Sequence, residues 1–201
     1  MRTEKINGVT VPYNLSTEEL EKMLTTNNMN EFVVACEALS HKEDEKAFEV
    51  LKGYIKNKDK YKSLCILKVI FNHPLSSQVF DFLEESIQSD DILFTQNGLN
   101  IVYKQNLSVD EKIILSAVFR HLHNLYMTDL YVLNSIPVNE ENYTILVELF
   151  KKSEKCGQKE VLSEILCKKY LPDKSRELYE LFSNDRFFKI RKIADKLGNN
   201  R

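Results

Sequence analysis

The sequence predicts an all-α fold, and composition and hydrophobic periodicity carry that prediction. The chain of 201 residues contains only 5 Gly and 4 Pro, whereas sheet proteins use both residues often to turn their strands. Abundant Leu, Ile, Glu and Lys also favour helices. Hydrophobic residues make up 43% of the chain, which is enough for a continuous core.

The segment 42–57 has the pattern of an amphipathic helix. Five of its apolar residues recur at i, i+3, i+4, i+7 and i+8, which places them on one stripe: Ala47, Val50, Leu51, Tyr54 and Ile55. The next segment, 60–71, is apolar almost all round and therefore needs cover on several sides. An amphipathic outer helix followed by a more buried inner helix is the unit of a helical solenoid.

The unit recurs along the chain, which predicts a right-handed α-solenoid of about five to six antiparallel helix pairs. The expected pairs are 17–25 with 29–39, 42–57 with 60–71, 79–87 with 91–104, 109–124 with 127–135, 139–154 with 158–170, and 174–183 with 186–198. Residues 16–201 are expected to form one repeat domain. Residues 1–15 are expected to be an irregular arm, in which Asn7-Gly8 forms either a small hairpin turn or part of a loose chain.

Capping residues and prolines mark the expected helix ends. A capping box, S-x-x-E, occurs at Ser16–Glu19 and recurs at Ser40–Glu43 and Ser108–Glu111, so it predicts three helix starts. Three prolines fall between the expected helices, where a missing N–H costs least: Pro74, Pro137 and Pro172.

The last expected helix resembles the second helix of a HEAT repeat. Asp185 stands at the turn, Ile190 and Arg191 follow five and six positions later, and Ala194 precedes a Leu-Gly end. In HEAT proteins the Asp and Arg often bond between successive turns, so the resemblance implies this structural role for Asp185 and Arg191. It also implies an ARM-type superhelix.

Upstream, the pattern is weaker. Asp59 and Asp90 are followed by leucines but not by the Arg, and they lie 31 residues apart. That spacing is shorter than the roughly 40–47 residues of a HEAT unit. The resemblance is therefore to HEAT-like or armadillo-type repeats as a group.

No catalytic or metal-binding motif stands out. His121 and His123 are two positions apart, and on a helix such side chains point about 200° apart, which does not suit one metal ion. The four cysteines form no C-x-x-C: Cys36, Cys65, Cys156 and Cys167. They are expected to be reduced thiols of a cytoplasmic protein. The sequence thus predicts no catalytic residue, no cofactor, no metal and no membrane span.

The charges are unevenly distributed. The segment 69–103 has no Lys or Arg, but it contains five acidic residues: Asp81, Glu84, Glu85, Asp90 and Asp91. The first three share one helix face, and the last two suit the N-terminus of the following helix. They form either a partner-binding surface or a solvated face with cations supplied by a neighbouring helix.

The C-terminal end is basic. Residues 168–201 include ten basic and five acidic residues, and Lys189, Lys192 and Lys196 lie on one face of the last helix. This face either keeps a terminal repeat soluble or receives an anionic partner.

These features favour a non-enzymatic scaffold or adaptor that binds another protein. One example would be a bacterial immunity-type protein whose acidic surface holds a basic partner, and the Lys-, Asn- and Ile-rich composition is typical of a low-GC bacterium. The alternative is a nucleic-acid-binding protein related to the HEAT-like DNA glycosylases that remove alkylated bases. Those enzymes use a basic concave surface with Trp, Asp and Arg, whereas this chain has no Trp and a net charge of −2.

Overall fold

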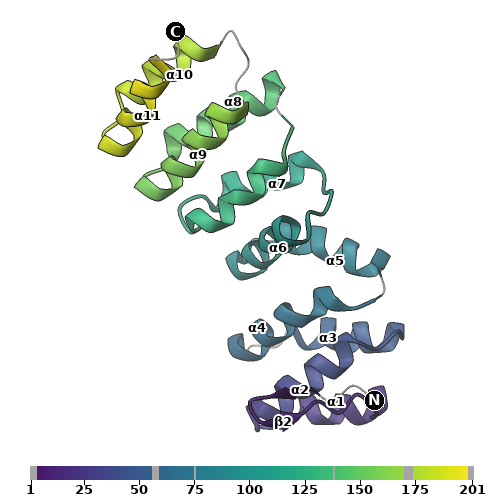
Figure 1. Ribbon diagram of the computed structural model, residues 1–201. Coiled ribbons are helices and arrows are strands. Elements are labelled where there is room, and N and C mark those ends of the chain that lie inside the picture. The colour runs from purple at the N-terminus through teal and green to yellow at the C-terminus, as the bar shows by residue number, and fades with distance from the viewer. Residues whose placement is uncertain (1–3, 56–58, 75, 138, 170–173, 199–201) are drawn as a thin grey trace. The chain divides into compact units, whose positions relative to one another are not determined.

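A computed structural model describes residues 4–55, 59–74, 76–137, 139–169 and 174–198, and the predicted all-α character is confirmed. The chain divides into two compact units, Met1–Ser86 and Ile87–Arg201. Unit 1 is the purple and blue part of Figure 1, and unit 2 is the teal, green and yellow part. The single repeat domain expected over 16–201 stays a prediction.

A β-hairpin opens unit 1. Strands β1 (Lys5–Ile6) and β2 (Val9–Thr10) pair antiparallel. Asn7 and Gly8 connect them with φ values of 52° and 81°, and two such residues are what a two-residue hairpin turn requires. The hairpin packs against the second helix, where Asn7 Nδ2 donates to Asn30 Oδ1 at 3.2 Å. Of the two alternatives for this segment, the hairpin turn is therefore confirmed.

The helices of unit 1 form two layers. They are α1 (Thr17–Leu24), α2 (Met29–Ser40), α3 (Glu45–Ile55), α4 (Lys60–Val69), the short 3₁₀ helix η1 (Ile70–Asn72) and α5 (Ser76–Gln88). Helix α2 packs against α1, α3 and α4, while α1 contacts α3. Helix α5 meets α3 through Phe82 and Phe48, whose ring centroids lie 6.1 Å apart. One layer is therefore α1, α3 and α5, and the other is α2 and α4.

Only one of the three predicted capping boxes exists. Ser16 Oγ accepts from Glu19 N at 3.3 Å, and Ser16 N donates to Glu19 Oε2 at 2.8 Å. The prediction at Ser40 is wrong because Ser40 is the last residue of α2, and its hydroxyl donates to the Glu37 carbonyl. Asp44 takes its place, since Asp44 Oδ1 accepts from Ala47 N at 2.7 Å at the start of α3.

The prediction at Ser108–Glu111 is wrong for a similar reason. Helix α7 (Glu111–His121) is capped by Asp110, whose Oδ1 accepts from Lys112 N at 2.8 Å. In a capping box the Glu is the third residue of the helix. Glu111 is instead the first residue of α7, so Ser108 and Glu111 do not form one.

Unit 2 has four segments in series. They are α6 (Ile92–Gln105), the 3₁₀ helix η2 (Met127–Ser135), α9 (Cys156–Lys169) and α11 (Phe188–Gly198), each in contact with the next. Helix α7 packs against α6 and η2, whereas α8 (Glu140–Lys152) and α10 (Ser175–Ser183) pack against α9. Pro74 and Pro137 lie between helices as expected. Pro172 is outside the described residues.

The helix expected at 127–135 is a 3₁₀ helix. Its buried Asp129 carboxylate accepts from Gln96 Nε2 at 3.1 Å, from Asn100 Nδ2 at 3.0 Å and from Tyr126 N at 2.8 Å. These bonds attach the first turn of η2 both to α6 and to its own N-terminus. A buried carboxylate needs such donors, because it has lost its water.

Long side chains connect successive turns within each unit. Lys62 Nζ donates to the Thr26 carbonyl at 3.0 Å in unit 1. In unit 2, Lys155 Nζ donates to the His123 carbonyl at 2.6 Å, while Arg120 and Arg186 donate to carbonyls in the turns that follow α5 and α8. Carbonyls at helix C-termini lack intrahelical partners, so cations there satisfy them. Of these four cations, only Arg186 belongs to the basic C-terminal segment 168–201.

We expect the buried His73 to make the stability of unit 1 depend on pH. His73 is 4% exposed, and its ring lies edge-on to that of Phe48, with 5.4 Å between the centroids. Burial lowers the pKa of His73 below the usual 6.5, although the charge of Asp44 acts in the opposite direction. As pH falls through 6.5, the unfolded chain binds the proton first, so the folded state is expected to lose stability. Urea unfolding at pH 7.5 and 5.5 checks this. The difference between the free energies of unfolding at the two pH values should be smaller in His73→Leu than in the wild type. An equal difference in both proteins would contradict the expectation.

Candidate functional site

The first three predicted acidic residues lie together on α5 in unit 1. Asp81 and Glu85 are exposed, and Glu84 is half-buried. Lys52 Nζ of α3 lies 3.4 Å from Glu85 Oε2, so a neighbouring helix supplies one cation. Among the residues that the structure describes, no Lys or Arg is within ion-pair distance of Asp81 or Glu84.

Asp90 and Asp91 belong to unit 2 and have local partners. Asp91 caps α6, because its Oδ1 accepts from Leu93 N at 2.9 Å. Asp90 Oδ1 lies 3.3 Å from Arg120 Nη1. The expectation that these two residues suit the start of the following helix therefore holds for Asp91, which is the capping residue.

The α1–α3–α5 layer carries eight carboxylates and only three lysines within its helices. All eight are exposed or half-buried: Glu18, Glu19, Glu21, Glu45, Glu49, Asp81, Glu84 and Glu85. We call them the acidic face. The members on α1 and α3 were not predicted, because each of these helices also contains lysine and reads as an ordinary solvated helix. Packing side by side is what joins them to α5.

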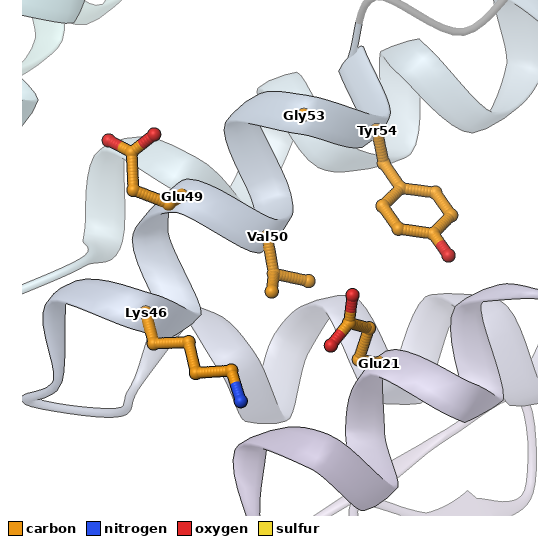
Figure 2. A pocket seen from close by; sticks show the side chains of 6 residues that line it. All are labelled: Glu21, Lys46, Glu49, Val50, Gly53 and Tyr54. Atoms are coloured by element: carbon orange, nitrogen blue, oxygen red, sulfur yellow. The ribbon is translucent and has the colours of Figure 1, made fainter.

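A hollow of about 510 Å³ lies in this face between α1 and α3. Its lining is Glu21 of α1 with Lys46, Glu49, Val50, Gly53 and Tyr54 of α3. Figure 2 shows the Val50 side chain and the Glu21 carboxylate pointing toward one another, with the Tyr54 ring at one side of the gap. The hollow thus combines an apolar wall, an aromatic ring and a carboxylate.

One ion pair spans the two helices beside this hollow. Lys46 Nζ donates to Glu18 Oε1 at 2.6 Å, which lowers the pKa of Glu18 and raises that of Lys46. Both groups are therefore charged at neutral pH. Among the described residues, Glu21 and Glu49 form no ion pair. The lysine in the lining thus bonds to Glu18, whereas no cation of the described residues pairs with Glu21 or Glu49.

The predicted basic residues of α11 are exposed. Lys189 Nζ lies 3.2 Å from Glu160 Oε1 of α9, and Lys192 Nζ lies 4.7 Å from the centroid of the Phe188 ring. Lys196 is exposed farther along the helix. Two of the three lysines therefore contact other side chains of this chain.

Asp185 and Arg191 meet through the backbone. Arg191 Nη1 donates to the carbonyl of Asp185 at 2.8 Å and to that of Arg186 at 2.9 Å. The Asp185 carboxylate accepts from Phe187 N at 2.8 Å and forms a buried ion pair with Lys159 of α9. Sequence reasoning missed Lys159, because nothing near it in the chain predicts a partner for its charge.

A second hollow of about 500 Å³ lies between α7 and α8. Leu115, Phe119 and Ile145 contribute its apolar surface, and Phe119 is 40% exposed. Lys152 Nζ lies 3.9 Å from the centroid of the Phe119 ring. Two cationic and two acidic residues also line this hollow: Lys112, Arg120, Glu141 and Glu148.

The histidines and cysteines have structural surroundings. His121 is buried with Nε2 3.0 Å from the Ser89 carbonyl, whereas His123 is exposed. Burial raises the pKa of Cys36, and it raises that of Cys167 to about 11, so neither is a reactive thiolate at neutral pH. Over the described ranges, no three His, Cys, Asp or Glu side chains gather as a metal site. No helix in those ranges is long and apolar enough to cross a membrane.

Comparison with known proteins gives no match of the chain to a family model, to a curated protein or to a solved structure.

Proposed function

We propose that this protein is a non-enzymatic scaffold that binds a basic protein through the acidic face of unit 1. The observation that carries the proposal is the packing of α1, α3 and α5 side by side. This packing brings eight carboxylates together with two ion pairs between helices, Lys46–Glu18 and Lys52–Glu85. Complementary charge speeds encounter with a basic partner and disfavours acidic ones. An immunity-type role, in which a toxin is neutralised, is one form of this function.

We further propose that the helix pairs form a HEAT-like, armadillo-type α-solenoid in the cytoplasm of a bacterium. The serial contacts among α6, η2, α9 and α11 and the recurring bonds between turns support stacked repeats. The bond from Arg191 to the Asp185 turn supports the resemblance at the last repeat. Four free cysteines are in keeping with a reducing compartment.

Nucleic-acid binding through Lys189, Lys192 and Lys196 has less support. The neighbouring cations Arg186 and Arg191 donate to backbone carbonyls, and Lys189 pairs with Glu160. Few phosphate contacts therefore remain available, whereas binding to nucleic acid depends on several.

Reversing the charge of α5 tests the proposed function. In Asp81→Lys/Glu84→Lys/Glu85→Lys, a hexa-arginine peptide at low salt should bind about tenfold more weakly than to the wild type, because attraction becomes repulsion. Isothermal titration measures the dissociation constants.

The control for net charge is Glu164→Lys/Glu177→Lys/Asp195→Lys, which makes the same change on exposed positions of unit 2. This control should bind the peptide within about threefold of the wild type. Equal weakening in both triple variants would mean that the peptide responds to overall charge, and the acidic face would then have no special role.

A further inference from the structure

We propose that the hollow between α1 and α3 holds an arginine side chain of the basic partner. This inference rests on the proposed function and names the contact at its centre. The hollow lies within the acidic face, and its lining offers the three surfaces that an arginine needs: a carboxylate, an aromatic ring and an apolar wall.

Gly53 lines the hollow without a side chain. Glycine inside a helix is less favourable than alanine, because it loses more conformational freedom on folding. A Cβ at Gly53 would meet no atom within 4 Å, and its φ is not in the left-handed region. Neither crowding nor backbone conformation therefore requires glycine here. The absent side chain leaves room beside Tyr54 for a group from outside the chain.

The other lining residues match the parts of an arginine. Val50 and the Tyr54 ring lie one turn apart on α3 and offer apolar contact to the methylene stem. The face of the Tyr54 ring attracts a guanidinium group by stacking and cation–π interaction. The Glu21 carboxylate, across the gap in Figure 2, can accept two parallel hydrogen bonds from the same group.

Arginine fits this lining better than lysine. A guanidinium is planar and more weakly hydrated, so it stacks on an aromatic ring while it pairs with a carboxylate. An ammonium is compact and strongly hydrated, and it gains less from the ring. Lys46 does not fill the hollow itself, because its ammonium group bonds to Glu18.

Two substitutions at Gly53 separate filling the hollow from changing the helix. Both Gly53→Gln and Gly53→Ala improve helix propensity and leave the charge of the face unchanged. The glutamine side chain is long enough to reach into the hollow, whereas a methyl group is not. With hexa-arginine as the titrant at low salt, Gly53→Gln should bind about fivefold more weakly than the wild type. Gly53→Ala should stay within about twofold of it.

Hexa-lysine is the second probe. It should bind the wild type more weakly than hexa-arginine does, and Gly53→Gln should leave its affinity unchanged. Circular dichroism should show that both variants keep the helical content of the wild type, so a loss of binding reports the hollow itself.

The outcomes distinguish this inference from the proposed function. If the α5 triple variant loses affinity for hexa-arginine but Gly53→Gln binds like Gly53→Ala, the hollow is not the subsite and the acidic face still stands. If hexa-lysine binds as tightly as hexa-arginine and is equally weakened by Gly53→Gln, the assignment to arginine is wrong. If the wild type binds neither peptide, the proposed function fails and this inference with it.

Discussion

Replacement of Asp185 by Ala is expected to destabilise the protein by about 3–5 kcal/mol, the usual effect of breaking a buried ion pair. Asp185 is 7% exposed and its partner Lys159 is 8% exposed. Without the carboxylate, the buried Lys159 ammonium loses its ion-pair partner and keeps the Phe150 ring, whose centroid lies 4.4 Å from Nζ. The substitution also removes the acceptor of the Phe187 N–H, which lies directly before α11.

Two further variants identify the cause of this loss. Asp185→Asn keeps an acceptor for the cap but lacks the charge, so it should still be destabilised. Lys159→Met/Asp185→Asn removes both charges and should recover most of the lost stability, because no unpaired charge stays buried. Urea unfolding followed by circular dichroism gives the free energies. A loss below about 1 kcal/mol in Asp185→Ala would mean that Lys159 reaches water easily.

Replacement of Phe182 by Ala should cost about 3–5 kcal/mol, as large-to-small changes of buried aromatic residues do. Phe182 of α10 is fully buried, and its ring centroid lies 5.0 Å from that of Phe150 in α8. The cavity left behind would lie between α10 and its neighbours, so amide hydrogen exchange should speed up first in α9, α10 and α11.

Phe188→Ala is the matched control for this substitution. Phe188 is 61% exposed on α11, so its removal should change the free energy of unfolding by less than about 1 kcal/mol. Similar losses in both variants would show that Phe182 does not anchor α10.

The local pattern of the sequence predicted the helices well but their starts less well. Ser16 was correct because it lies outside a helix and has Glu19 at the right distance. Ser40 has the same spacing, but α2 continues through it, and Asp44 caps the next helix instead. A four-residue motif does not show whether the preceding helix has already ended. The start of the next helix therefore depends on which residues form the capping hydrogen bonds.

The candidate surface was predicted only in part. Asp81, Glu84 and Glu85 stood out because no cation occurs nearby in sequence. Glu21 and Glu49 did not, because each lies on a helix that also carries lysine. Their common surface depends on the contact between α1 and α3, and the commitment of Lys46 to Glu18 also depends on that contact. Neither is a property of one segment.

The central claim is that the acidic face of unit 1 receives a basic protein segment. Nuclear magnetic resonance of the 201-residue chain, labelled with ¹⁵N and titrated with hexa-arginine, tests it most directly. Shifted amide signals should cluster in α1, α3 and α5, with the largest changes at Glu21, Gly53 and Tyr54. Shifts centred on the hollow between α7 and α8, or spread evenly over exposed acidic residues of both units, would contradict the account.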